Sequence, residues 1–300
     1  MSKTNDTNLF SKEPVSRLAS ELPIKGKGIA STGWDMLDTF TGGFHNGDLI
    51  VVSGFSNMGK TTFIHNLIKH ICVEEGLPVL YFSFQTLEAE IVRSLVASIG
   101  HTNYPPILPS PSSIGENKDK EAEFDTRYTC VFHAPIHICN EELDERSLCE
   151  VARNYVRVHG IKAIFIDGFY NIKGACSADN VQDQIFRSLK ALALHLDLPV
   201  IVTHTYKSSD RTNDFSRVLY PKFDLAIYNP AYDAADLVLV LNRPELLGVR
   251  IDNNGHDLRG VLFVGIDKDC RGREGVLPLR YSRSSKTIWE DDNMPWPLEL

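Results

Sequence analysis

The sequence predicts an α/β fold: a mostly parallel central sheet flanked by helices, with an antiparallel extension at its C-terminal end. Between residues 48 and 205, short apolar segments typical of buried strands alternate with segments of helical spacing. From residue 235 onward, close-set apolar segments are separated by glycine-containing turns, a pattern typical of antiparallel strands. The chain has 300 residues, of which 43% are hydrophobic, so it is long enough to bury the core of such a sheet.

The individual elements follow from these patterns. The expected strands of the parallel part are 48–53, 78–84, 130–138, 161–168 and 199–205. The expected helices between them are 61–75, 141–160 and 180–198. The expected strands of the antiparallel part are 235–243, 260–268, 275–282 and 286–290. Residues 101–128, rich in proline, serine and charge, do not fit the alternation, and we expect a long exposed loop, partly mobile.

Residues 1–28 precede this pattern as an N-terminal tail, residues 29–290 form the main domain, and residues 291–300 form a C-terminal tail. Apolar residues at helical spacing in the N-terminal tail predict a short amphipathic linker helix. These residues are Val15, Leu18, Ala19 and Leu22, after Pro14. Because so short a helix cannot bury its apolar face alone, it either folds back on its own domain or docks on a neighbouring subunit.

Composition restricts the partners and the compartment. The formal net charge is −8, so contact with nucleic acid must come from a local basic surface rather than from overall charge. The six cysteines form no C-x-x-C pair, and we expect free thiols in a reducing compartment. There is no apolar run long enough to span a bilayer, and the polar N-terminus lacks an apolar signal core. We therefore expect a cytoplasmic protein with no membrane partner.

The segment SGFSNMGKTT, residues 53–62, fits the phosphate-binding pattern G-x-x-x-x-G-K-[ST] and lies between an expected strand and an expected helix. Glycines allow backbone N–H groups to surround a phosphate, Lys60 can neutralise the β- and γ-phosphates, and the Thr61 hydroxyl can bind Mg²⁺. The pattern predicts ATP and Mg²⁺ as ligands. The expected nucleotide-binding residues are Gly54, Ser56, Asn57, Met58, Gly59, Lys60, Thr61 and Thr62.

A P-loop also needs an acidic group on a neighbouring strand, aimed at the magnesium ion. Asp167 ends the apolar run AIFID and is the candidate for this role. The alternative is that Asp167 only terminates its strand. The P-loop upstream favours the magnesium role, so Thr61 and Asp167 are the expected metal ligands.

Six stretches, in order, resemble the C-terminal motor domain of DnaB-type replicative helicases, in the RecA-like class of superfamily 4. The first begins with IASTGWDMLD at Ile29 and runs through TGGF to the P-loop. The other five are residues 81–90, 161–174, 198–207, 233–245 and 265–282. The resemblance covers about residues 29–290 and implies a RecA-like ATPase domain in a homohexameric ring around single-stranded DNA. It also implies that the N-terminal helix docks on the next subunit, and it suggests a primase or a helicase loader as a partner.

The resemblance implies that a glutamate after the second strand activates the attacking water. Gln85 occupies that position, and an amide can hold a water through its carbonyl oxygen but is not a base. Loss of a general base typically costs about 10²–10⁴-fold in rate. Glu88, about one helical turn further on, is the alternative base. Because Ras-type GTPases position water with a glutamine, slow hydrolysis is the expectation.

The resemblance also places a lysine and, two residues later, an arginine finger at the neighbouring subunit's nucleotide. Lys268 matches the lysine, but Cys270 occupies the finger position, with Arg271 adjacent and Arg273 beyond. Either Arg271 supplies the finger, an effect worth about 10³–10⁵-fold in other NTPases, or both arginines are solvated turn charges.

The γ-phosphate sensor of the family corresponds to His204 and Thr205. His204 either donates a hydrogen bond to the phosphate or is a structural residue near a strand end.

In the family, the loops after the Asp167 strand and after the sensor strand line the pore. The matching segments carry basic residues interspersed with tyrosines, which suits a nucleic-acid phosphate track with base stacking. These basic residues are Lys173, Lys207, Arg211, Arg217 and Lys222, with Tyr206 and Tyr220 between them. The alternative is a pair of solvated loops, since three aspartates dilute the charge.

The sequence therefore favours a DnaB-like, ATP-dependent DNA helicase or translocase motor that forms rings on single-stranded DNA, with slow hydrolysis. The alternative is an ATP-binding, RecA-like assembly or regulatory module with little or no unwinding activity, which Gln85 and Cys270 favour. A small-molecule kinase fits poorly, because the terminal antiparallel strands and Lys268 would have no role in it.

Overall fold

The computed structural model describes residues 30–99, 118–177, 179–205, 230–252, 255–272 and 274–291, with side chains described for all of these except 118–125 and 179. The expected N-terminal helix and nearly all of the expected C-terminal tail lie outside the described residues. Within the described part, no helix has the length and apolar character needed to cross a membrane.

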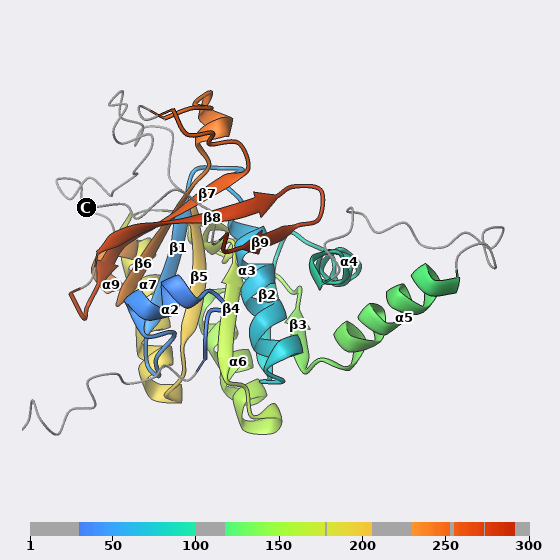
Figure 1. The fold of residues 1–300 in the computed structure, drawn as a ribbon. Helices are drawn as coiled ribbons and strands as arrows, with labels where there is room; N and C mark the ends of the chain where they lie inside the picture. The colour runs from blue at the N-terminus through green and yellow to red at the C-terminus, as the bar shows by residue number, and fades with distance from the viewer. Residues whose placement is uncertain are drawn as a thin grey trace, which may run out of the picture.

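A nine-stranded sheet with the order β3-β2-β4-β5-β1-β6-β7-β8-β9 forms the centre of the molecule (Figure 1). The strands are β1 Leu49–Gly54, β2 Val79–Ser83, β3 Ile136–Cys139, β4 Ala163–Asp167, β5 Val200–Thr205, β6 Leu237–Asn242, β7 Val261–Asp269, β8 Gly275–Ser282 and β9 Thr287–Trp289. The strands from β3 to β6 in this order pair in parallel, and β7, β8 and β9 pair antiparallel. The predicted fold class is confirmed, except that the segment 235–243 is the last parallel strand and not the first of the extension.

The helices lie on both faces of the sheet. They are α2 Asp35–Thr41, α3 Lys60–Ile68, α4 Glu88–Ile99, α5 Lys118–His133, α6 Glu145–His159, α7 Asp179–Leu196 and α9 Pro230–Ala234. The other helical segments are η1 Lys69–Glu74, a π-helix that continues α3, and the 3-10 helices η2 Phe169–Asn171 and η4 Pro244–Leu247. Helix α6 begins where the Asp144 side chain accepts a hydrogen bond from the Ser147 N–H (2.8 Å) and ends at Gly160, in the left-handed region.

Two apolar layers result from the two-residue period of the strands. On one face, Ile50 and Val52 of β1 pack with residues of α3. On the other face, Leu49 and Val51 pack with residues of α6 and α7. The same alternation decides on which face each polar residue at the end of a strand emerges.

The segment 101–128 differs from the expectation where it is described. Residues 118–128 form the first turns of α5, which lies beyond α4 at the periphery of the molecule (Figure 1). They contain no proline or glycine and many good helix formers, whereas the prolines that suggested a loop lie in 101–117, outside the described residues. The expected strand 130–138 is wrong at its start, because α5 continues to His133 and β3 begins at Ile136.

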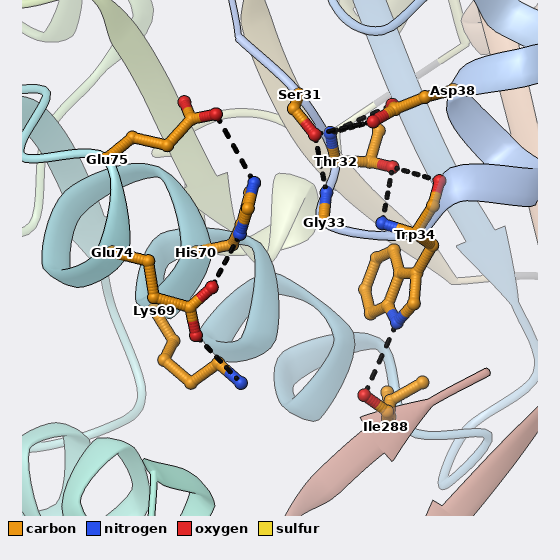
Figure 2. Close-up of polar contacts among 10 residues, drawn as sticks. All are labelled: Ser31, Thr32, Gly33, Trp34, Asp38, Lys69, His70, Glu74, Glu75 and Ile288. Carbon is orange, nitrogen blue, oxygen red and sulfur yellow. Dashed lines mark hydrogen bonds and ion pairs between the residues drawn. The ribbon is translucent and has the colours of Figure 1, made fainter.

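The first described residues, which belong to the IASTGWDMLD segment, pack against η1 and β9 (Figure 2). The Asp38 side chain accepts a hydrogen bond from the Thr32 N–H (2.9 Å), and the indole of Trp34 donates to the Ile288 carbonyl (3.3 Å). Gly33 has φ +83°, and a Cβ there would lie 2.6 Å from Cγ of His70. A glycine is therefore required for this segment to lie against η1.

Candidate active site

The P-loop connects the C-terminal end of β1 to the first turn of α3. Gly54 has φ +153°, and a Cβ there would lie 2.7 Å from the Leu241 carbonyl oxygen. Gly59 has φ +97° and precedes α3, and a Cβ there would lie 3.2 Å from the Tyr281 ring. Both glycines are needed for the backbone to pass so close to its neighbours. The Met58 side chain is buried beneath the loop, so only its backbone can face a ligand.

Lys60 lies folded across the P-loop. Its Nζ donates hydrogen bonds to the carbonyl oxygens of Gly54 (3.0 Å) and Phe55 (2.8 Å). Burial lowers the pKa of Lys60 to about 8, although the negative charge of Asp167 acts in the opposite direction. The ammonium group thus lies where the loop surrounds a phosphate, and it would exchange two carbonyl partners for phosphate oxygens.

Asp167 lies at the end of β4 with both carboxylate oxygens held. The Thr203 hydroxyl donates to Oδ1 (2.7 Å), and the Tyr81 hydroxyl donates to Oδ2 (3.2 Å). Burial and the charge of Asp167 raise the pKa of Tyr81 well above its usual value, so this phenol remains a donor. The Tyr81 hydroxyl also contacts Nε2 of His65 (3.2 Å), and burial lowers the pKa of His65 to about 4, which keeps the ring neutral.

Sequence reasoning missed Thr203 and Tyr81 as partners of Asp167. The pairing of Ile166 with Val202 sets Thr203 beside Asp167 and on the same face of the sheet. The alternation of faces along β5 was visible in the sequence, but the register between β4 and β5 was not.

His204 emerges on the opposite face of the sheet from Asp167. Its Nδ1 lies 3.3 Å from the Ser53 hydroxyl, and its Nε2 lies 3.0 Å from the Tyr170 hydroxyl. The ring is also surrounded by aromatic residues and is 5% exposed. These contacts favour the structural interpretation of His204, because contact with phosphate would require the ring to exchange a partner.

Gln85 lies two residues beyond Ser83, which pairs with Asp167 across β2 and β4. Its Nε2 donates a hydrogen bond to Oδ1 of Asn171 (2.9 Å), in the short helical segment that follows β4. The structure therefore brings the predicted water-positioning residue to the same end of the sheet as Asp167. Glu88, the alternative base, is the first residue of α4.

A stacked pair that the sequence did not indicate lies against the P-loop. The Arg243 guanidinium carbon lies 3.8 Å from the centroid of the Tyr281 ring, and this ring lies 3.2 Å from the position that a Cβ on Gly59 would take. Arg243 is 5% exposed, forms an ion pair with Glu245, and its backbone N–H donates to the Met58 sulfur (3.3 Å). A stacked cationic and aromatic pair, with Tyr281 8% exposed, thus lies buried beside the phosphate loop.

Lys268 and Arg271, the two cations expected to act at the neighbouring subunit's nucleotide, lie away from the P-loop, toward the opposite end of the sheet. Strand β7 runs antiparallel to β6, so Asp269 at its end pairs with Leu237 at the start of β6. The register shift between Val238 and Leu239 leaves Asp267 as an extra residue just before Lys268. Through the pairing of β7 with β6 and of β6 with β1, Lys268 is level with Val51, three residues or about 10 Å along the strand from Gly54. Arg271 contacts Asp48, six residues or about 20 Å along the strand from Gly54.

Each of these cations is held locally. Lys268 donates to the carbonyl oxygens of Tyr232 (2.7 Å) and Asp233 (3.3 Å) in α9. Arg271 donates to both carboxylate oxygens of Asp48, at 2.9 and 3.2 Å. Cys270 between them is exposed. Neither cation therefore reaches the P-loop of its own chain.

Of the predicted DNA-binding residues, Lys173 is described. Its side chain is exposed and lies 3.9 Å from Glu142, and its backbone N–H donates to the Leu143 carbonyl (2.9 Å). The remaining ones, Lys207, Arg211, Arg217 and Lys222, lie outside the described residues, as do Tyr206, Tyr220 and Arg273.

The fold and this site define a P-loop NTPase domain of the RecA-like class. The family model "DnaB-like helicase C terminal domain" matches residues 28–289, and the chain belongs to this family. It is 26% identical over 278 residues to the replicative DNA helicase DnaB of Haemophilus influenzae, covering 89% of this chain and 56% of that protein. It is 28% identical over 257 residues to the DnaB helicase of Pasteurella multocida, covering 84% of this chain and 53% of that protein.

The chain thus spans about half the length of the curated relatives it matches. Among solved structures, one ATPase domain is similar with a TM-score of 0.77 and 19% identity, over 94% of this chain and 98% of that chain. A DnaB-like replicative helicase studied for its interactions with primase gives a TM-score of 0.76 and 18% identity, over 93% of this chain and 66% of that chain. These two similarities support the fold.

Proposed function

We propose that this chain is the motor domain of a cytoplasmic, ring-forming DNA helicase or translocase that hydrolyses ATP slowly with Mg²⁺ between neighbouring subunits. The observation that carries the proposal is the position of Lys268 and Arg271. Along the strand direction they lie about 10 Å (Lys268) and about 20 Å (Arg271) from Gly54 of their own P-loop, and both are held there by local partners. A second copy of the chain would bring these cations to a nucleotide, so the active site is completed by assembly.

The residues at the P-loop fit a magnesium-bound triphosphate. The two glycines with positive φ bring the backbone into close contact with its neighbours, and Lys60 already lies among the loop carbonyls. Thr61 and Asp167 would hold Mg²⁺, and the two hydroxyls that donate to Asp167 fix the orientation of its carboxylate. The ion would supply charge neutralisation and orientation of the phosphates.

The base of the nucleotide would stack on the Tyr281 ring after the Arg243 side chain moves off it, because the two residues are 5% (Arg243) and 8% (Tyr281) exposed as they stand. This pair is planar, adjoins Gly59, and is next to the loop that would hold the phosphates. A stacking surface accepts any base, and therefore the choice of ATP over other nucleoside triphosphates rests on the resemblance and not on this contact.

Hydrolysis would use Gln85 to hold the attacking water, because its amide lies at the Asp167 end of the sheet. An amide orients water without removing its proton, so turnover would be slow by comparison with a glutamate. Gln85→Glu is expected to raise the rate by at least about tenfold.

Partners follow from the family. We propose that six copies form a ring and that single-stranded DNA occupies its channel, with Lys173 contributing one positive charge per subunit. The amphipathic segment of residues 15–22 would dock on the next subunit. A primase is a candidate partner because a structural relative is described with one.

Two observations favour a second function, that of an ATP-binding assembly or regulatory module. Arg271 is held by Asp48 and Gln85 lacks a carboxylate, so the same fold could bind ATP and assemble without productive hydrolysis. Tight ATP binding without DNA-stimulated turnover in the wild-type protein would identify this function.

Mixing two inactive variants tests the shared site. Lys60→Ala removes nucleotide binding but keeps the trans cations, and Lys268→Ala removes one trans cation but keeps the P-loop. Each variant is expected to be inactive, while an equimolar mixture recovers DNA-stimulated turnover at mixed interfaces. The matched control mixes Lys60→Ala with the Lys60→Ala, Lys268→Ala double variant and stays inactive. Full activity of Lys268→Ala by itself would contradict the shared site.

A further inference from the structure

We infer that Asn171 is a positioning residue that orients the Gln85 amide so that its carbonyl oxygen faces the attacking water. The inference rests on the proposed function of Gln85. It adds a specific residue, outside the P-loop and the magnesium ligands, on which the rate of hydrolysis depends.

The first evidence is the direction of the hydrogen bond. Nε2 of Gln85 donates to Oδ1 of Asn171 over 2.9 Å. A glutamine amide has an NH₂ group on one side and a carbonyl oxygen on the other. Since the NH₂ group is directed at Asn171, the carbonyl oxygen is directed away from it. A carbonyl oxygen is the part of the amide that can accept a hydrogen bond from a nucleophilic water.

The second evidence is how Asn171 is itself held. The Asn171 N–H donates to the Gly168 carbonyl oxygen (2.9 Å), which closes the short helical turn after β4. Gly168 has φ +98°, and a Cβ there would lie 2.1 Å from Nδ2 of Asn171. The side-chain amide of Asn171 therefore occupies space that only a glycine at position 168 leaves open.

This turn is also joined to the expected metal ligand. The Gly168 N–H donates to the Thr203 hydroxyl (2.7 Å), and that hydroxyl donates to Asp167 (2.7 Å). One run of hydrogen bonds thus connects Asp167, through Thr203 and Gly168, to Asn171 and Gln85. The position of the Gln85 amide is set relative to the carboxylate that would hold Mg²⁺, so the water would be aligned with the phosphates that this ion binds.

Asn171 is chemically suited to a glutamine, and not a glutamate, at position 85. An aspartate at position 171 could still accept a hydrogen bond from Gln85, because a carboxylate is an acceptor. With a glutamate at position 85, the same aspartate would place two like charges together. The effect of changing Asn171 should therefore reverse with the residue at position 85, whereas a purely structural role for Asn171 would give the same effect in both backgrounds.

The test measures ATP turnover of the full chain with saturating single-stranded DNA. With Gln85 present, Asn171→Ala is expected to lower kcat about three- to tenfold without changing KM for ATP, and Asn171→Asp is expected to retain kcat within about twofold. In the Gln85→Glu background, Asn171→Asp is expected to lower kcat at least about tenfold, and Asn171→Ala to change it by less than about twofold. Asn154→Ala, at an exposed asparagine of α6, is the control.

The outcomes separate the two claims. If Gln85→Ala lowers turnover but Asn171→Ala does not, the inference is wrong and the proposed role of Gln85 stands. If Gln85→Ala and Gln85→Glu both leave turnover unchanged, the role of Gln85 fails and the inference fails with it. If Asn171→Ala and Asn171→Asp lower kcat equally in both backgrounds, Asn171 has a structural role and the inference is wrong.

Should the wild-type chain not turn over ATP, the side-chain amide signals of ¹⁵N-glutamine-labelled protein provide the test. Asn171→Ala is then expected to shift the Gln85 NH₂ resonances, which are assigned by their loss in Gln85→Ala, while Asn154→Ala leaves them in place. Unchanged resonances in folded Asn171→Ala would overturn the hydrogen bond and the inference.

Discussion

Arg271 and Asp48 form a two-bond ion pair at the base of the sheet, between the end of β7 and the residue that precedes β1. The guanidinium donates to both carboxylate oxygens, at 2.9 and 3.2 Å. The Asp48 side chain is 9% exposed, and burial raises its pKa while Arg271 opposes this rise. Arg271 is therefore anchored, in contrast to the solvated turn charge that the sequence left open as an alternative.

Removing Arg271 should destabilise the chain, because Asp48 would remain largely buried without its partner. We expect Arg271→Ala to lower the free energy of unfolding by about 1–2 kcal/mol at pH 7. Asp48→Asn added to this variant should recover part of the loss, since the charge at position 48 is then removed. The rest should remain, because Arg271 also pairs with the buried Asp269 carboxylate (3.7 Å). Urea unfolding measures both changes, and additive effects of the two substitutions would contradict a direct pair.

Nucleotide binding should depend on pH through Lys60. The pKa of Lys60 is lowered to about 8 by burial, and bound phosphate would raise it by adding negative charge. Binding near pH 8 should therefore take up protons, and affinity should fall as the pH rises above about 8, by up to about tenfold per unit. Titration calorimetry in buffers of different ionisation enthalpy measures the uptake.

Lys60→Arg provides the control for this linkage, because an arginine stays protonated throughout this pH range. If this variant binds nucleotide, its proton uptake in the same buffers should be absent. The same uptake in wild type and variant would assign the titration to another group.

Thr203 should contribute to Mg²⁺ affinity, because its hydroxyl donates a hydrogen bond to Asp167, an expected Mg²⁺ ligand, over 2.7 Å. Thr203→Val keeps the shape of the side chain but removes this donor, and also the acceptor of the Gly168 N–H. We expect the Mg²⁺ concentration for half-maximal nucleotide binding to rise at least about tenfold. Thr203→Ser keeps the hydroxyl and should stay near wild type. Equal behaviour of the valine and serine variants would show that this donor is not needed.

Tyr281 should contribute to nucleotide affinity through the base. Tyr281→Ala is expected to weaken ATP binding about tenfold, whereas Tyr281→Phe keeps an aromatic face and should bind nearly as well as wild type. Inorganic triphosphate has no base and tests the same loop without stacking. If Tyr281→Ala weakens the binding of triphosphate and of ATP to the same degree, Tyr281 stabilises Gly59 and the loop and does not stack on the base.

Patterns within short segments of the sequence were enough to predict the fold class and the location of the phosphate loop. The glycine and lysine spacing of residues 54–61 and the apolar strand before Asp167 were sufficient to predict the phosphate loop and its acidic neighbour. The alternation of strand and helix was sufficient for the fold class. These features depend on local backbone geometry and on the spacing of apolar residues, every two residues in a strand and about every 3.6 in a helix. Both can be read from neighbouring residues in the sequence.

Tertiary structure decided which distant residues meet. The register of β5 against β4 set Thr203, and not His204, beside Asp167. The antiparallel direction of β7 carried Arg271 to Asp48, 223 residues away in sequence. The packing of β8 against the P-loop brought the Tyr281 ring to Gly59. Such contacts depend on how separate strands align, and that register is set by the apolar faces of both partner strands packing together, not by either strand alone.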